Sequence, residues 1–269
     1  MNVYAPVLHW QSWAVLGRHV RVHLRKWHTA LLPPVFDPLV MLAAFGLGLG
    51  RQIGGVAWEG RTLDYLSYLA PGILAYTAFM TAFFQSLFTA YIRMHFQKSW
   101  EGQLTTQIRL EHVVWGEVLW AATLSTAYSV MVCLVLGGFG AAGWLDLHWA
   151  WLPCTLPLLF LSALGFACLG LLFTALLPSM DHMSLPFFLV ILPIGFASNT
   201  YFPMPDLPVL RELSLANPLL QLCEGLRKLL LDGALSPSLA AAAGLSLLMM
   251  LVLLPLDFRR LRRRVFGDA

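Results

Sequence analysis

Few residues of this sequence have the types and spacing that chemistry requires. His19 and His23 are four residues apart, as metal ligands on one helix face are, but they alternate with arginines and predict a surface helix without a metal. Asp181 and His182 are adjacent, which fits either a catalytic pair or two solvated residues in a turn. The sequence holds no GxxxxGKS/T loop, no HExxH and no GxSxG. We therefore expect no enzyme active site on this chain.

One acidic residue stands apart because of its surroundings. Glu117 falls near the start of a long apolar segment. A carboxylate at the centre of a bilayer costs about 2.5–3.5 kcal/mol, and less near the edge, so Glu117 is expected to face protein or water. A structural ion pair and a gating role both fit this position. The four cysteines lack CxxC spacing and are expected to be buried apolar side chains.

The composition is that of a membrane protein. Hydrophobic residues make up 58% of the chain and the mean hydropathy is +0.71, whereas soluble domains contain roughly 45–50% apolar residues. Several apolar runs reach the ~20 residues that a helix needs to cross a bilayer. The net charge of +3 is small and does not indicate nucleic-acid binding. These features predict an all-α integral membrane protein.

The apolar runs predict one membrane domain over residues 1–269. An amphipathic segment at 9–28 has Trp on one face and Arg on the other, as helices in the headgroup plane do. The first span is expected to start near Asp37, a good N-cap before Pro38. An outward loop with a re-entrant helix is expected at 204–236 and a basic tail at 258–269. The six predicted spans are 35–50, 66–92, 113–138, 153–177, 184–203 and 237–257.

A charged segment separates the second and third spans. Its apolar residues recur every four positions, which predicts one face of a helix over 96–108; they are Phe96, Trp100, Leu104 and Ile108. The segment is too polar to cross a bilayer. It is either a solvated helical loop or a lever through which a soluble partner moves the adjacent spans.

The distribution of positive charge predicts the orientation. Twelve of the 17 Lys and Arg residues lie in the two termini and in the charged segment. By the positive-inside rule these parts are expected in the cytoplasm. The other side holds Arg51, Arg61, Arg211, Arg227 and Lys228. The predicted lever therefore faces the compartment that holds ATP.

Aromatic residues suggest where a substrate could pass. Tyr76, Phe79 and Phe83 share one face of the second predicted span, and Phe187 lies in the fifth. We consider them a candidate path, although aromatic stripes on helices usually pack in a core.

Four segments, in order, carry a family resemblance: DPLVMLAAFGLGLG, YLAPGILAYTAFMTAFF, SWEGQLTTQIRLEHVVWGEVLWAA and NPLLQLCEGLR. With them the chain resembles, over nearly its whole length, the membrane subunit of ABC-2 type exporters (the type V fold), in particular nodulation-factor lipooligosaccharide and polysaccharide export permeases. Glu117 after Gly116 matches the family's Gly-Glu at the third span. The positions of the family's Asn-Pro signature are held by Asn217, Pro218, Glu224 and Arg227.

The resemblance implies a role for the charged segment. In that family it is the coupling helix, between spans two and three, seated in a cleft of an ATPase subunit. The residues implied to touch the ATPase are Trp100, Glu101, Gln103, Leu104 and Thr105. Thr106-Gln107 stands where the family often has Thr-Pro, which leaves the exit angle of the helix open.

The resemblance also implies an assembly and a cargo. We expect a homodimer in the bacterial inner membrane with two ATPase subunits that hold ATP and Mg, and no cofactor on this chain. The expected cargo is a lipid-linked or acylated oligosaccharide. Alternatives are an exporter of hydrophobic drugs or natural products, a lipid-modifying enzyme that uses Asp181 and His182, and a subunit that transmits force to a partner.

Overall fold

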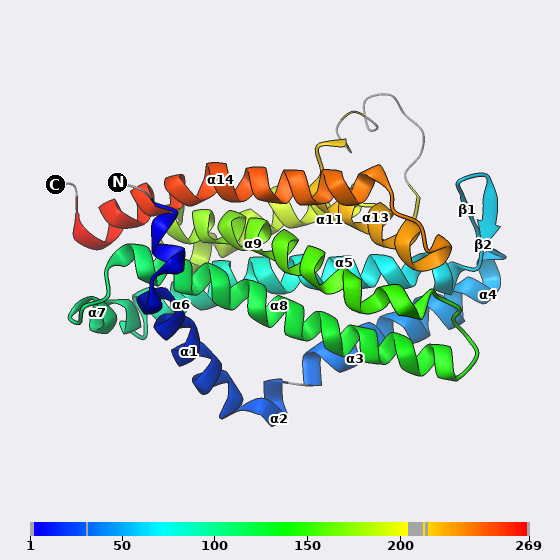
Figure 1. Ribbon diagram of the computed structural model, residues 1–269, viewed down its shortest axis with the longest axis horizontal. Helices are drawn as coiled ribbons and strands as arrows, with labels where there is room; N and C mark the ends of the chain where they lie inside the picture. Colours follow the sequence, from blue (N-terminus) through cyan, green and yellow to red (C-terminus); the bar gives the residue numbers. More distant parts are fainter. Residues whose placement is uncertain (1–2, 31, 204–211, 213–214, 268–269) are drawn as a thin grey trace.

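The computed structural model describes residues 3–30, 32–203, 212 and 215–267. The chain forms an elongated helical bundle in which both ends of the chain and α7 lie at one end and the only described hairpin lies at the other (Figure 1). Five described helical segments are long and apolar enough to cross a membrane: Leu32–Leu49, Tyr65–His95, Leu110–Ala141, Trp149–Leu176 and Pro237–Phe266. A sixth apolar segment, Met180–Phe196, is shorter. The predicted count of six spans therefore depends on that segment.

The first span begins earlier than its sequence suggests. Two short helices, α1 (Trp10–Leu24) and α2 (Trp27–Ala30), lead into α3 (Leu32–Met41), a π-helical stretch (Leu42–Leu49) and α4 (Gly50–Ile53). Pro33 and Pro34 occupy the first turn of α3, where a missing N–H leaves no hydrogen bond unmade. Asp37 is consequently inside the helix and is not its N-cap, and its side chain is exposed.

A hairpin joins this span to the second. Strand β1 (Val56–Trp58) pairs antiparallel with β2 (Arg61–Leu63), with Val56 opposite Leu63. Glu59 and Gly60 form the turn with φ of 45° and 78°, the positive values that two-residue hairpin turns require. Asp64 then caps α5 (Tyr65–Phe84) by accepting a hydrogen bond from the Leu66 N–H at 3.1 Å.

The second span contains a π-helical turn. Helix α5 continues through Gln85–Thr89, which is π-helical, into α6 (Ala90–His95). A π turn displaces carbonyls from their usual helical partners. Here the Thr174 hydroxyl donates to the Ser86 and Leu87 carbonyl oxygens at 2.6 and 2.8 Å. A side chain from another helix thus stabilises the irregular turn.

The charged segment is a shorter helix than predicted. Helix α7 covers only Ser99–Leu104, six residues, so Phe96 and Ile108 lie outside it. Lys98 has φ 52°, a left-handed conformation that separates α7 from α6. At the other end the Thr105 and Thr106 hydroxyls donate to carbonyls of the last turn, at 2.9 and 2.7 Å, and end the helix. The four-residue spacing therefore did not predict a single face.

The remaining helices complete the bundle. The predicted fifth span, 184–203, is broken and ends at Phe196, since Pro186 and Pro193 interrupt regular hydrogen bonding. Residues 204–211, with Arg211, lie outside the described part. Helix α14 continues to Phe266, so the basic residues predicted as a tail extend the last span. The elements are α8 (Leu110–Ala141), a 3-10 turn (Trp149–Trp151), α9 (Leu152–Leu176), a 3-10 turn (Met180–Met183), α10 (Ser184–Pro186), a π turn (Phe187–Ile191), α11 (Leu192–Phe196), α13 (Pro218–Asp232) and α14 (Pro237–Phe266).

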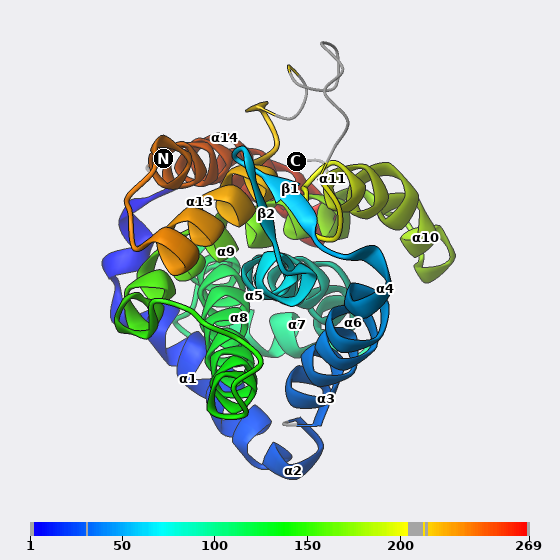
Figure 2. The same cartoon turned by 90° about the vertical axis from the view of Figure 1, so that its right-hand side faces the viewer.

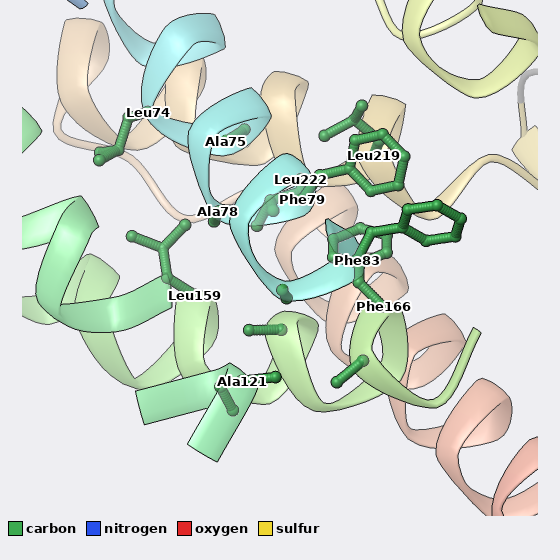
Figure 3. Close-up of a cluster of buried hydrophobic side chains, with 14 of the residues drawn as sticks. Leu74, Ala75, Ala78, Phe79, Phe83, Ala121, Leu159, Phe166, Leu219 and Leu222 are labelled. Carbon is green, nitrogen blue, oxygen red and sulfur yellow. The ribbon is translucent and has the colours of Figure 1, made fainter. Parts of the chain in front are cut away.

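Helix α5 is the centre of the bundle (Figure 2). It packs against α8, α9 and α13, and its Phe79 and Phe83 rings are fully buried beside Phe166 of α9 (Figure 3). Both rings therefore pack in the core of the chain, as aromatic stripes on helices usually do. In this structure neither ring lines an open path.

Candidate functional site

At the α7 end, one buried carboxylate connects four helices. Glu117 of α8 is 1% exposed. The Arg93 guanidinium of α6 binds it with two hydrogen bonds, one of them from Nε to Oε1 at 3.0 Å. The Trp100 indole N–H of α7 donates to the same Oε1 at 2.9 Å, and His19 Nε2 of α1 lies 3.4 Å from it. Glu117 therefore makes the structural ion pair that its position allowed.

This geometry fixes α7 to the spans. Two parallel hydrogen bonds from one guanidinium are a strong and directional arrangement. The Ser99 hydroxyl adds a bond to the Arg93 carbonyl at 3.1 Å, so the first two residues of α7 are attached to α6 and α8. A displacement of α7 must move these helices with it or break the hydrogen bonds from Ser99 and Trp100.

The predicted contact residues of α7 divide into two faces. Trp100 is 1% exposed and Gln103 is buried, so both point into the protein and are not available to a partner. Glu101 and Thr105 are exposed, and Leu104 is half-buried. Glu101 pairs with Lys98 at 2.7 Å on the open surface. The predicted partner contact therefore stays a prediction for Glu101, Leu104 and Thr105, whose side chains are at least partly exposed.

A cleft opens beside this exposed face. It has a volume of about 660 Å³ and lies between the exit of α7 and the end of α14. Its lining mixes apolar and basic side chains from both segments, including Leu104, Ile108, Arg109, Phe258 and Arg262. The basic end of α14 is thus part of the same surface as α7.

Gly116 lets α1 approach α8 closely. A Cβ at this position would overlap the Val15 side chain and lie 3.4 Å from the Ser12 carbonyl oxygen. A glycine therefore precedes Glu117 because the two helices touch there. The Trp115 indole N–H donates to the Val3 carbonyl at 2.7 Å and fixes the N-terminal segment to the same helix.

At the opposite end, a second buried ion pair holds α13. Arg227 is 0% exposed and donates from Nη1 to Glu224 Oε1 at 2.7 Å. Its other nitrogens donate to the Tyr68 carbonyl at 3.1 Å and the Asn199 carbonyl at 2.9 Å, and its plane lies 3.9 Å from the centre of the Tyr68 ring. Trp58 and Asn199 also donate to Glu224, at 2.9 and 3.0 Å. The Glu224 and Arg227 side chains thus connect α13 to the hairpin, to α5 and to the Asn199 backbone.

Asn217 and Pro218 start α13 and join it to α11. The Asn217 side-chain oxygen accepts from the backbone N–H groups of Leu219 and Leu220, which caps the helix. Its side-chain N–H₂ donates to the Ile194 and Ala197 carbonyls at 3.0 and 2.7 Å. The Asn-Pro signature is therefore both a cap and a link between two helices.

A rim of surface ion pairs surrounds this cluster. Lys228 pairs with Glu59 of the hairpin and with Asp232 at 2.8 Å, and Arg61 pairs with Asp232. Desolvation raises the pKa of the Asp232 carboxyl, but hydrogen bonds from Lys228 and Arg61 outweigh it and keep that pKa below its ordinary value. The hairpin is thereby held over α13.

Asp37 is a polar residue whose role the sequence did not indicate. It is exposed on a helix of spanning length, and such a carboxylate must face water or protein because lipid would cost too much. Its face of the helix continues through Met41 to Phe45. These two line an apolar hollow of about 420 Å³ with Phe196, Tyr201 and Phe202. Asp37 also lies within electrostatic range of the Tyr76 and Tyr201 hydroxyls. The sequence signal that could have indicated this position is an acidic residue within a segment that is otherwise apolar.

The other candidates do not converge on a site. The Ser179 hydroxyl lies 2.9 Å from His182 Nδ1 within an exposed turn, and Asp181 lies beside it, so these residues interact only locally. No group of three His, Cys, Asp or Glu residues that could hold a metal occurs in the described part of the chain. Phe187 is exposed at the break in the fifth apolar segment.

Comparison with known proteins identifies relatives. The sequence model of a family described as ABC-2 type transporter matches residues 11–231. The chain is 33% identical to Nodulation protein J of Rhizobium leguminosarum bv. trifolii over 79% of this chain and 85% of that protein. It is 31% identical to Nodulation protein J of Sinorhizobium fredii over 98% of both chains. It is 22% identical to the inner membrane transport permease YadH of Escherichia coli over 80% of both.

Proposed function

Since this chain belongs to the ABC-2 type transporter family, we propose that it is the permease subunit of an exporter powered by ATP hydrolysis on a separate subunit. The observation that carries the proposal is the attachment of α7 to the Glu117 cluster. A partner that pushes the exposed face of α7 acts directly on α6 and α8. The chain itself supplies no catalytic group in this proposal, and ATP and Mg belong to the partner.

The membrane arrangement follows from the charges. We place the chain in the bacterial inner membrane with α7 and both termini in the cytoplasm, because most of its Lys and Arg residues lie at that end. The shorter segment Met180–Phe196 then serves as the sixth span. The hairpin and α13 face outward, with α13 as the re-entrant helix.

A homodimer with two ATPase subunits is the proposed assembly. The spanning helix Leu32–Leu49 has only 22% of its residues buried within one chain. Asp37 lies on its open side and requires water or protein opposite it. A second copy across this face would supply both, with a path between the two protomers.

The proposed cargo is a lipid-linked or acylated oligosaccharide. The aromatic rings of the hollow, such as Tyr201 and Phe45, suit sugar rings as well as an apolar chain. Asp37, exposed eight residues before Phe45 on the same span, can accept hydrogen bonds from sugar hydroxyls. Relatives named Nodulation protein J agree with export of such a compound. An uncharged hydrophobic drug or natural product would make no use of Asp37 and is the second candidate.

The experiment measures ATPase activity of the subunit co-expressed with its cognate ATPase, in nanodiscs with and without glycolipids. The test variant is Thr105→Arg, on the exposed surface at the end of α7, and the control is Asp146→Asn, an exposed residue in the loop that follows α8. Glycolipid stimulation that is lost in Thr105→Arg alone supports the coupling role and the cargo class. Failure to form a complex with any ATPase would reject the proposal. Stimulation by hydrophobic drugs and not by glycolipids would replace the cargo.

A further inference from the structure

A second cleft lies between α1 and the π turn of the second span. It has a volume of about 380 Å³. One face of α1 and the residues just after it line one wall, with Arg18, Val22, His23 and Lys26. The opposite wall comes from the second span and α8. This cleft is separate from the hollow beside Asp37 and from the cleft beside α7.

The lining of this cleft is basic and contains no acid. Arg18 and Lys26 bring two basic side chains to the lining, and Arg93, also in the lining, is paired with Glu117. Burial lowers the pKa of His23 below its ordinary value, so at neutral pH it adds an uncharged imidazole. The remaining polar groups of the lining are the amides of Gln85 and Gln97, the hydroxyls of Thr89 and Tyr128, the His19 imidazole and the Trp120 indole. Such a surface attracts an anion with several acceptor oxygens.

An apolar groove continues from this basic cleft. It is lined by Met80, Phe84 and Phe88 and shares Gln85, Thr89 and Tyr128 with the cleft. The rings of Phe84 and Phe88 stack with centroids 5.2 Å apart. The groove follows the second span, so it runs along the expected direction of a lipid chain. A charged end and an apolar continuation are thus joined in one surface.

The position of the cleft along the bundle matches the headgroup zone of a bilayer leaflet. Helix α1 exposes Trp10 and Trp13 beside its arginines, the composition of a helix in the headgroup plane. The basic cleft is formed by that same helix, whereas the apolar groove is formed by a spanning helix. The two parts of the surface therefore match the two zones of a bilayer leaflet.

We propose that this surface binds one acidic phospholipid of the bilayer, with its phosphate between Arg18 and Lys26 and one acyl chain against Phe84 and Phe88. The lipid would occupy the junction between α1 and the second span, next to the Glu117 cluster. This site is distinct from the proposed cargo path. It depends on the chain's place in a membrane and not on which compound is exported.

Native mass spectrometry of the purified full chain in neutral detergent tests the proposal. The probes are phosphatidylglycerol and phosphatidylcholine with identical acyl chains, and inorganic phosphate. The variants are Arg18→Gln/Lys26→Gln and, as a matched control, Arg21→Gln, an exposed arginine of α1 that does not line the cleft. Each removed cation is expected to weaken phosphatidylglycerol binding about fivefold, which corresponds to about 1 kcal/mol. The control is expected to change it less than twofold.

A third variant examines the acyl-chain part. Phe88→Ser is expected to weaken binding of both phospholipids several-fold and to leave their ratio unchanged. The proposal is overturned if phosphatidylcholine binds as tightly as phosphatidylglycerol, if Arg21→Gln has the effect of the double variant, or if inorganic phosphate binds as tightly as the lipid. Because these measurements need neither ATPase nor cargo, their failure is distinct from failure of the proposed export function.

Discussion

Replacing Glu117 with Gln tests whether the buried cluster holds α7 in place. The substitution keeps the size of the side chain and an oxygen that can accept from the Trp100 indole. It removes the negative charge opposite Arg93, whose side chain is only 9% exposed. The guanidinium would then be buried without a counter-charge.

The expected cost is about 3–5 kcal/mol, the range for removal of one partner from a buried ion pair. This is a large share of the roughly 5–15 kcal/mol that stabilises a typical domain. The double variant Arg93→Met/Glu117→Gln is expected to recover at least half of the loss, because no unpaired charge remains. A pair replaced by apolar groups is often neutral in stability.

The assay is denaturant unfolding of the purified subunit in detergent micelles, followed for the wild type, both single variants and the double variant. Glu101→Gln serves as the control, because its pair with Lys98 is exposed and such pairs contribute about 0–1 kcal/mol. A cost below about 1 kcal/mol for Glu117→Gln would refute the reasoning. So would a double variant whose loss is the sum of the two single losses.

Three other changes test separate parts of the structure. Gly116→Ala is expected to cost about 1–3 kcal/mol by overpacking against Val15, and Val15→Ala in the same chain should recover much of it, as thermal denaturation of both variants would show. Asp37→Asn is expected to weaken binding of a hydroxyl-rich cargo about tenfold, because a charge-assisted hydrogen bond is lost, and to leave thermal stability unchanged. A loss of stability without a transport defect in proteoliposomes would contradict this. Since the pKa of Asp232 is lowered by folding, its contribution to stability is complete above its ordinary value of 3.8 and is lost as pH falls through the folded value; Asp232→Asn should flatten that acid limb in unfolding titrations.

The sequence predicted the segments that depend on composition and missed those that depend on contacts. Apolar runs place helices because burial in a bilayer is a property of the run itself. The end of a helix depends on local bonds. The threonine hydroxyls after α7 and the left-handed Lys98 shorten that helix to six residues, and the four-residue spacing carries no information about either.

The site was predicted in part for a related reason. The need for a partner to Glu117 followed from the cost of a buried charge, but the choice of Arg93 and Trp100 required the fold. Trp100 was expected to touch the ATPase subunit because the family resemblance implied that contact. Its indole N–H instead donates to the buried Glu117 carboxylate, and this hydrogen bond turns the Trp100 side chain toward the protein interior. Asp37 was assigned to a helix end because Asp-Pro is a common start, whereas Pro33 and Pro34 already provide one.

The two buried ion pairs are joined by one helical segment. Tyr68, near the start of α5, holds Arg227 through its carbonyl and ring, and Arg93, near the end of α6, holds Glu117. They are 25 residues apart, or roughly 35–40 Å at the rise of a helix. Between them lies the π turn at Gln85–Thr89, whose released carbonyls are bound by Thr174 of α9. One continuous helical segment therefore connects the residues that hold α7 with those that hold α13, and the π turn is where its hydrogen-bond ladder is interrupted.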